Sequence, residues 1–134
     1  MQDNVGIASE ESYKYTAKDG DCQAELDDKS AQISGFKLIP SSREEVLKYV
    51  IAKIGPVNAV IDPSGGFIQY KEGVYYNPNC NTNSSFLHAV LIVGYGSDGP
   101  GKDFYWVKNS WGNSIYIIFM RTFSFYSTLN NFRN

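Results

Sequence analysis

The stretch from Phe86 to Gly112, FLHAVLIVGYGSDGPGKDFYWVKNSWG, limits what this chain can fold into more than any other. It contains the only histidine of the chain, His88, and it ends in an Asn-Ser-Trp-Gly run that begins at Asn109. Two apolar segments rich in β-forming residues, 88–95 and 104–107, flank a loop of glycine and proline. This pattern predicts an antiparallel β-hairpin whose first strand is buried.

The loop decides which residues face one another across this hairpin. The tight turn runs from Ser97 to Lys102, with Pro100 near its centre. Opposite residues then have numbers that sum to about 200, so His88 lies opposite roughly residue 112. Asn109 is within a few residues of that position, and a bulge or a twist closes the remaining gap. The sequence therefore predicts an imidazole close to an amide side chain.

The residue types at these positions suit an oriented general base. Histidine changes protonation near neutral pH and is the side chain most often used in acid–base catalysis. The carbonyl group of Asn109 can accept the ring N–H and hold His88 in one tautomer without adding charge. A large apolar ring such as Trp111 would keep water from that hydrogen bond. The alternative interpretation is that His88 is an ordinary core or surface residue and that the Asn-Ser pair only forms a turn.

Composition indicates a globular domain and argues against several classes of function. The chain has 134 residues, of which 43% are hydrophobic and 19% charged, enough for one packed domain. A net charge of -2 gives no reason to expect nucleic-acid binding. The longest apolar run, Ala89–Val93, is too short to cross a membrane, and the first residues do not form a secretory signal. One histidine and two distant cysteines cannot supply a tetrahedral metal site, so neither a metal nor a cofactor is expected.

The remaining segments predict one helix and several short strands. Apolar side chains recur at three and four residues from Ser42 to Lys53, which predicts an amphipathic helix over about 42–54. Ser42 and Glu45 match a capping box, and Gly55-Pro56 ends the helix. Strands are expected at 31–39 (with a bulge at Gly35), 57–61, 73–76 and 115–125, and one helical turn at 67–71. We find no linker that would define a second domain.

Several sequence blocks resemble the C-terminal half of papain-family cysteine peptidases, most of all the cathepsin L-like branch. In the order of the family they are EESYKY (10–15), IGPV (54–57), AVID (59–62), YKEGVYY (70–76), HAVLIVGYG (88–96) and YWVKNSWG (105–112). The resemblance implies an α+β fold, namely the antiparallel β-rich right-hand lobe of a two-lobed enzyme, with one main helix and incomplete by itself. It also implies a partial papain-like domain over residues 1–114 and a divergent tail over residues 115–134.

The resemblance assigns roles to residues in the last two blocks. His88 would be the catalytic base, Asn109 the residue that orients it, and Trp111 the shield of their hydrogen bond. The enzyme would be a cysteine-type endopeptidase acting on peptides or proteins. Its other partner would be the missing N-terminal lobe, and its location would be lysosomal or extracellular. Neither nucleic acid nor membrane is expected as a partner.

The resemblance also implies a specificity pocket. By the family's pattern its walls would be Val60, Phe86 and Ala89. Such walls would favour an apolar side chain two residues before the cleaved bond.

The sequence departs from the family in two regions. The nucleophilic cysteine and the oxyanion-hole glutamine belong to the family's N-terminal half, and nothing here resembles its Cys-Gly-x-Cys-Trp segment. Cys22 and Cys80 instead match half-cystines, with partners expected in the missing N-terminal part and near the C-terminus, so the two are not expected to be bonded to each other. Asn113–Tyr116 stands where the family usually has a second Trp-Gly. These departures suggest a truncated or misassembled gene product, with Met1 an internal methionine or false start and the tail a read-through.

Two functions of different classes are compatible with these observations. The first is the C-terminal portion of a papain-like cysteine endopeptidase, which supplies the histidine and asparagine, lacks the nucleophile and is inactive alone. The second is an inactive fragment or pseudoenzyme that acts as a binding or inhibitory module. It would use the apolar face that should meet the other lobe.

Overall fold

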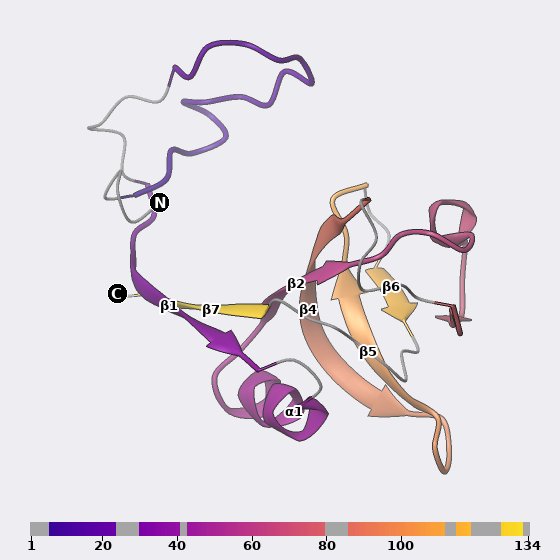
Figure 1. Cartoon of the computed structure of the whole chain (residues 1–134). Helices are drawn as coiled ribbons and strands as arrows, with labels where there is room; N and C mark the ends of the chain where they lie inside the picture. The colour runs from indigo at the N-terminus through magenta and orange to yellow at the C-terminus, as the bar shows by residue number, and fades with distance from the viewer. Residues whose placement is uncertain are drawn as a thin grey trace. The chain divides into compact units, whose positions relative to one another are not determined.

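The computed structural model describes residues 6–23, 30–40, 43–79, 86–111, 115–118 and 127–132. Its elements are β1 (Ile33–Ile39), α1 (Glu44–Lys53), β2 (Val57–Ile61), the 3-10 helix η1 (Phe67–Gln69), β3 (Val74–Tyr75), β4 (His88–Ser97), β5 (Asp103–Lys108), β6 (Ile115–Ile118) and β7 (Ser127–Phe132) (Figure 1). The chain divides into two compact units, Met1–Lys37 with Asn130–Asn134, and Leu38–Leu129. The division falls inside β1 and β7.

Apart from the parts of β1 and β7 that belong to it, the described residues of the first unit form turns and one isolated β-bridge. Ile7 and Ala31 exchange two backbone hydrogen bonds of 2.9 and 3.3 Å. The Tyr13 hydroxyl accepts the N–H of Gln23 at 3.3 Å. Cys22 is exposed and unpaired, and Cys80 lies outside the described residues. The expectation that Cys22 and Cys80 are not bonded to each other therefore stays a prediction.

The sheet has the strand order β1-β7-β2-β4-β5-β6-β3. β2, β4, β5 and β6 pair antiparallel with their neighbours, and the short β3 pairs parallel with β6. Together with α1, the one α-helix among the described residues, this arrangement confirms the predicted α+β class and the predicted strands at 57–61, within 73–76 and within 115–125. The sheet places the central β4–β5 hairpin between β2 and β6.

The core of the second unit lies on one face of this sheet, beneath α1. Alternation along the strands sends every second side chain to that face. The helix adds Leu47 and Val50, which are buried in the same cluster. The strand residues of this cluster are Val57, Ala59, Ile61, Val90, Ile92, Tyr105 and Val107. Burying these side chains supplies most of the free energy that holds the hairpin in place.

The helix begins later than its predicted start. It begins at Glu44, and Arg43 at the N-cap makes no side-chain capping hydrogen bond. The predicted capping partner Ser42 lies outside the described residues. The predicted end is confirmed, because the Gly55 N–H reaches the Val50 carbonyl at 3.1 Å with a φ of 141° that favours glycine.

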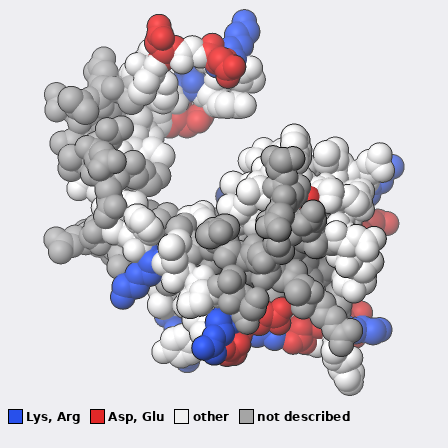
Figure 2. Space-filling model, in the orientation of Figure 1, with Lys and Arg blue, Asp and Glu red and all other residues white. Residues whose placement is uncertain are grey.

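Neither the surface charge nor the helix of the described residues suggests binding to a charged polymer or insertion into a membrane. On the face in Figure 2, basic and acidic side chains of the described residues are intermingled. No helix in the described part of the chain combines the length and the apolar character needed to span a membrane.

Candidate active site

His88 and Asn109 meet where the β4–β5 hairpin opens. His88 is the first residue of β4, and Asn109 directly follows the last residue of β5. The His88 Nε2 atom lies 2.8 Å from Asn109 Oδ1, a normal hydrogen-bond length. Asn109 is 6% exposed, so this bond forms in a largely water-free environment. The predicted juxtaposition of imidazole and amide is therefore present.

A second hydrogen bond fixes the direction of the first. The backbone N–H of Ser110 donates to Asn109 Oδ1 at 2.7 Å. A backbone N–H can only donate, so the carbonyl oxygen of the amide, and not its NH₂ group, must face Ser110 and His88. His88 Nε2 must then carry the proton that it donates to this oxygen. This leaves the lone pair on His88 Nδ1, which can accept a proton from another group.

A β-bulge sets the register that brings these residues together. Gly94 pairs with Trp106, whereas Ile92 pairs with Val107, so the register shifts by one residue at Val93. Bulges of this kind re-aim side chains beside functional sites.

The shifted register carries His88 toward Trp111. The two rings stack with centroids 4.6 Å apart and an interplanar angle of 26°. Trp111 remains 46% exposed, so it covers one side of the imidazole only.

Phe67 completes the aromatic surroundings of His88, a role that was not predicted for it. Its ring is 3% exposed and lies 6.3 Å from the His88 ring and 5.7 Å from the Trp111 ring. A third contact, edge to face, joins it to Tyr75 at 5.4 Å. The only available signal was an aromatic residue directly after a Gly-Gly pair, which indicates a turn that ends in the core.

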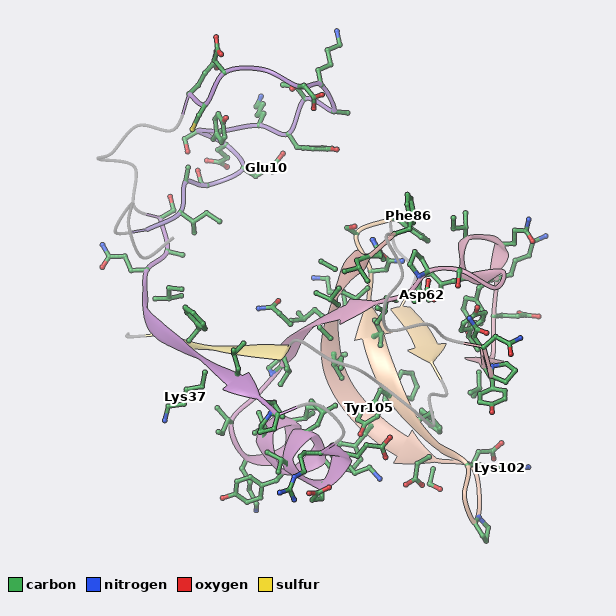
Figure 3. All side chains as sticks on the ribbon, in the orientation of Figure 1. Glu10, Lys37, Asp62, Phe86, Lys102 and Tyr105 are labelled. Atoms are coloured by element: carbon green, nitrogen blue, oxygen red, sulfur yellow. The ribbon has the colours of Figure 1, made fainter. Side chains whose placement is uncertain are left out.

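The turn before Phe67 is held by polar groups. Asp62, buried just past the end of β2 (Figure 3), accepts the Ser64 N–H at 3.0 Å and the Ser64 hydroxyl at 2.8 Å. From the other side, the Tyr75 hydroxyl donates to the carbonyl oxygens of Ser64 and Gly65 at 2.8 and 2.9 Å. Hydrogen bonds with Asp62 and with Tyr75 thus hold the turn that places Phe67 beside His88.

The predicted pocket residues are partly brought together. Val60 and Ala89 are direct cross-strand partners of β2 and β4, so their side chains lie on the same face of the sheet. The next pair along, Ile61 and His88, lies on the opposite face. Phe86 precedes β4 and is 69% exposed (Figure 3). The specificity role of these residues stays a prediction.

The shifted pKa values lie at the α1 end of the hairpin. Burial raises the pKa of the Tyr105 phenol well above its usual value, and burial also raises the pKa of Glu44. The hydrogen bond from Lys48, 2.6 Å from Asp103, lowers the pKa of that carboxyl. Within the described part of the chain, no group of three or more His, Cys, Asp and Glu side chains is placed to hold a metal.

Comparisons with a family profile and with individual proteins point to the same family. A profile of the family described as "Papain family cysteine protease" matches residues 1–120. Cathepsin S of Bos taurus is 49% identical over 111 residues, which are 82% of this chain and 33% of that protein. Procathepsin L of Rattus norvegicus is 43% identical over 116 residues, 84% of this chain and 34% of that protein. The chain thus spans about a third of the length of these curated relatives.

Solved structures show the same likeness. The digestive procathepsin L2 proteinase of Tenebrio molitor larval midgut superposes with a TM-score of 0.83 at 36% identity, covering 96% of this chain and 44% of that one. The bromelain protease of Ananas comosus, solved with the E64 inhibitor, gives a TM-score of 0.79 at 28% identity, covering 98% of this chain and 65% of that one. The fold of this chain is accordingly an incomplete portion of a papain-like one.

Proposed function

Because the chain belongs to the papain family of cysteine proteases, we propose that it is the C-terminal, base-bearing portion of a papain-like cysteine endopeptidase. The observation that carries the proposal is the His88–Asn109 hydrogen bond of 2.8 Å beneath the stacked Trp111 ring. In this proposal His88 is the base, Asn109 orients it, and Trp111 shields their bond. Residues 1–114 form the papain-like portion, and residues 115–134 form a tail that diverges from the family.

The chemistry needs a cysteine thiol from the N-terminal half of such an enzyme. His88 Nδ1 takes the thiol proton, giving a thiolate beside an imidazolium. The thiolate attacks the peptide carbonyl, and His88 returns the proton to the leaving amine as the C–N bond breaks. His88 then takes a proton from water as its oxygen attacks the thioester, and the C–S bond breaks to release the acid and to restore the thiolate beside the imidazolium. Throughout these steps Asn109 keeps the Nε2 proton in place.

The chain by itself has a base without its nucleophile. Neither Cys22 nor Cys80 lies in a segment resembling the family's nucleophile motif. Loss of the nucleophile removes most of the rate enhancement of such enzymes. We therefore expect no peptide hydrolysis by the isolated chain. The complete enzyme would be lysosomal or extracellular, and Val60, Phe86 and Ala89 would select an apolar substrate side chain.

Reconstitution tests the proposal. The chain is mixed with the separately expressed N-terminal half of a cathepsin L-like relative, and thiol-dependent cleavage of a fluorogenic peptide is measured. Activity should appear, and His88→Ala should lower it by roughly 10²–10⁴-fold, the usual contribution of a general base. Lys108→Met is the matched control, because this exposed side chain neighbours Asn109 in sequence and should leave activity unchanged. A stable complex without turnover, or turnover by the isolated chain that His88→Ala abolishes, would contradict the proposal.

The exposed apolar side chains near the hairpin opening favour a second candidate, a binding or inhibitory module. Phe86, Leu87 and Trp111 are large, exposed and close in sequence to His88 or Asn109. Exposed apolar patches mark interaction sites. If the chain is such a module, it should run as a stable monomer in sizing chromatography and inhibit an intact cathepsin L-like enzyme. Neither is expected of a lobe that needs its other half.

A further inference from the structure

We propose that Tyr75 is a positioning residue of the His88 site, because its hydroxyl holds the 62–66 turn that sets Phe67 against His88 and Trp111. The inference rests on the proposed function, since positioning matters only if His88 is the base. It assigns a role to a tyrosine that touches neither the base nor its hydrogen-bond partner in any contact described above. The role follows from three contacts made by the one side chain.

The first two contacts are hydrogen bonds to the backbone of the turn. The Tyr75 hydroxyl lies 2.8 Å from the Ser64 carbonyl oxygen and 2.9 Å from the Gly65 carbonyl oxygen. A phenol has one proton to donate, so the two carbonyls share it. A single hydroxyl thereby fixes two successive peptide groups.

The turn needs such an anchor because its backbone is conformationally free. Gly65 and Gly66 have φ values of 71° and 93°, a region that glycine enters without steric cost. Glycine also loses the most backbone freedom on ordering, so two in succession leave the turn weakly defined by its own sequence. Asp62 fixes the near side through Ser64, and Tyr75 fixes the side that leads into Phe67.

The third contact carries the constraint to the site. The Tyr75 and Phe67 rings meet edge to face at 5.4 Å and 77°. Phe67 in turn lies 5.7 Å from the Trp111 ring and 6.3 Å from the His88 ring. Tyr75 thus holds Phe67 in two ways, through the backbone of the turn before Phe67 and through the contact between the two rings. Loss of the hydroxyl should let Phe67 shift and loosen the stack of His88 on Trp111.

The stack can be read directly by fluorescence. The chain has two tryptophans, so Trp106→Phe leaves Trp111 as the sole reporter. Because the His88 and Trp111 rings are stacked at 4.6 Å, the imidazole should quench Trp111 by close contact. The signal is the difference in Trp111 emission intensity between the chain and its His88→Gln variant, which removes the ring. This difference is the quenching amplitude, measured for each variant below with and without His88→Gln.

In that background, Tyr75→Phe should lower the amplitude by about twofold or more, since ring interactions weaken as the centroids separate. Tyr70→Phe is the matched control, because its hydroxyl donates to Gly73 and not to the turn, and the amplitude should be retained. Urea unfolding is measured alongside. A lowered urea midpoint with an unchanged Trp111 amplitude would show a purely structural role and overturn the proposal.

A second variant covers the case in which Tyr75→Phe does not fold. Gly65→Ala strains the same turn, because its Cβ would lie 2.6 Å from Asn77 Nδ2 and its φ is 71°. It too should lower the amplitude, and an unchanged amplitude would overturn the proposal. The assay uses neither substrate nor thiol. A failure of reconstituted peptidase activity would therefore refute the proposed function and leave this result standing.

Discussion

Replacing Phe67 by leucine should destabilise the chain through its aromatic contacts rather than through lost burial. Phe67 is 3% exposed and has ring contacts with Tyr75, His88 and Trp111 at 5.4, 6.3 and 5.7 Å. Leucine keeps most of the buried apolar volume but has no ring. Each aromatic pair contributes about 0.5–1.5 kcal/mol beyond burial, so the loss should be about 2 kcal/mol. Alanine would cost about 3–5 kcal/mol, a large share of the roughly 5–15 kcal/mol that holds a domain folded.

Urea unfolding measures this loss. With an m-value of about 1–3 kcal/mol/M, the midpoint of Phe67→Leu should fall by roughly 1 M. Ile68→Ala is the matched control, since this neighbouring side chain is 67% exposed and its removal should cost less than about 0.5 kcal/mol. If Phe67→Leu costs no more than Ile68→Ala, the aromatic surroundings of the site are not formed as described, and the reasoning fails.

Two further predictions concern the hairpin that carries the site. Burial raises the pKa of Tyr105 in the folded chain. The neutral phenol therefore contributes its full share to the free energy of unfolding below the unfolded-state pKa of about 10, and this share is lost as the pH rises toward the folded-state pKa. The urea midpoint should therefore decrease less between about pH 8 and about pH 11 in Tyr105→Phe than in the parent chain. An equal decrease in the two proteins would contradict this prediction. Gly96→Ala should destabilise the hairpin more than Gly94→Ala in thermal unfolding, because the added Cβ lies 2.7 Å from Phe104 in the first case and 3.4 Å from Trp106 in the second. Equal melting temperatures would refute that comparison.

The sequence was most informative where a pattern is local. Apolar spacing and Gly55-Pro56 located the helix, and the glycine-rich loop at Pro100 located the hairpin. The pairing argument placed His88 and Asn109 near each other with an error of about one residue. That error is the bulge at Val93, where a β-branched residue in an apolar run gives no sign that it will be left unpaired.

The remaining parts of the site depend on contacts between distant residues. Phe67 meets His88 and Trp111 only because the sheet brings β2, β4 and β5 together. A 3-10 helix of three residues has no period from which its buried face can be read. The Tyr75 hydroxyl likewise donates to carbonyl oxygens in a turn that contains two glycines. Because glycine has no side chain, the backbone conformation of this turn cannot be predicted from the sequence.

The tautomer of His88 tests the central claim, an imidazole oriented by Asn109, most directly. The chain has one histidine, so a long-range ¹H–¹⁵N correlation spectrum of the labelled protein at neutral pH reports on His88 without assignment. A bond worth about 1–1.5 kcal/mol favours the matching tautomer by roughly five- to tenfold. We predict a proton on Nε2 and a lone pair on Nδ1, with the preference weakened in Asn109→Ala. A proton on Nδ1, or a spectrum that Asn109→Ala leaves unchanged, would contradict the account.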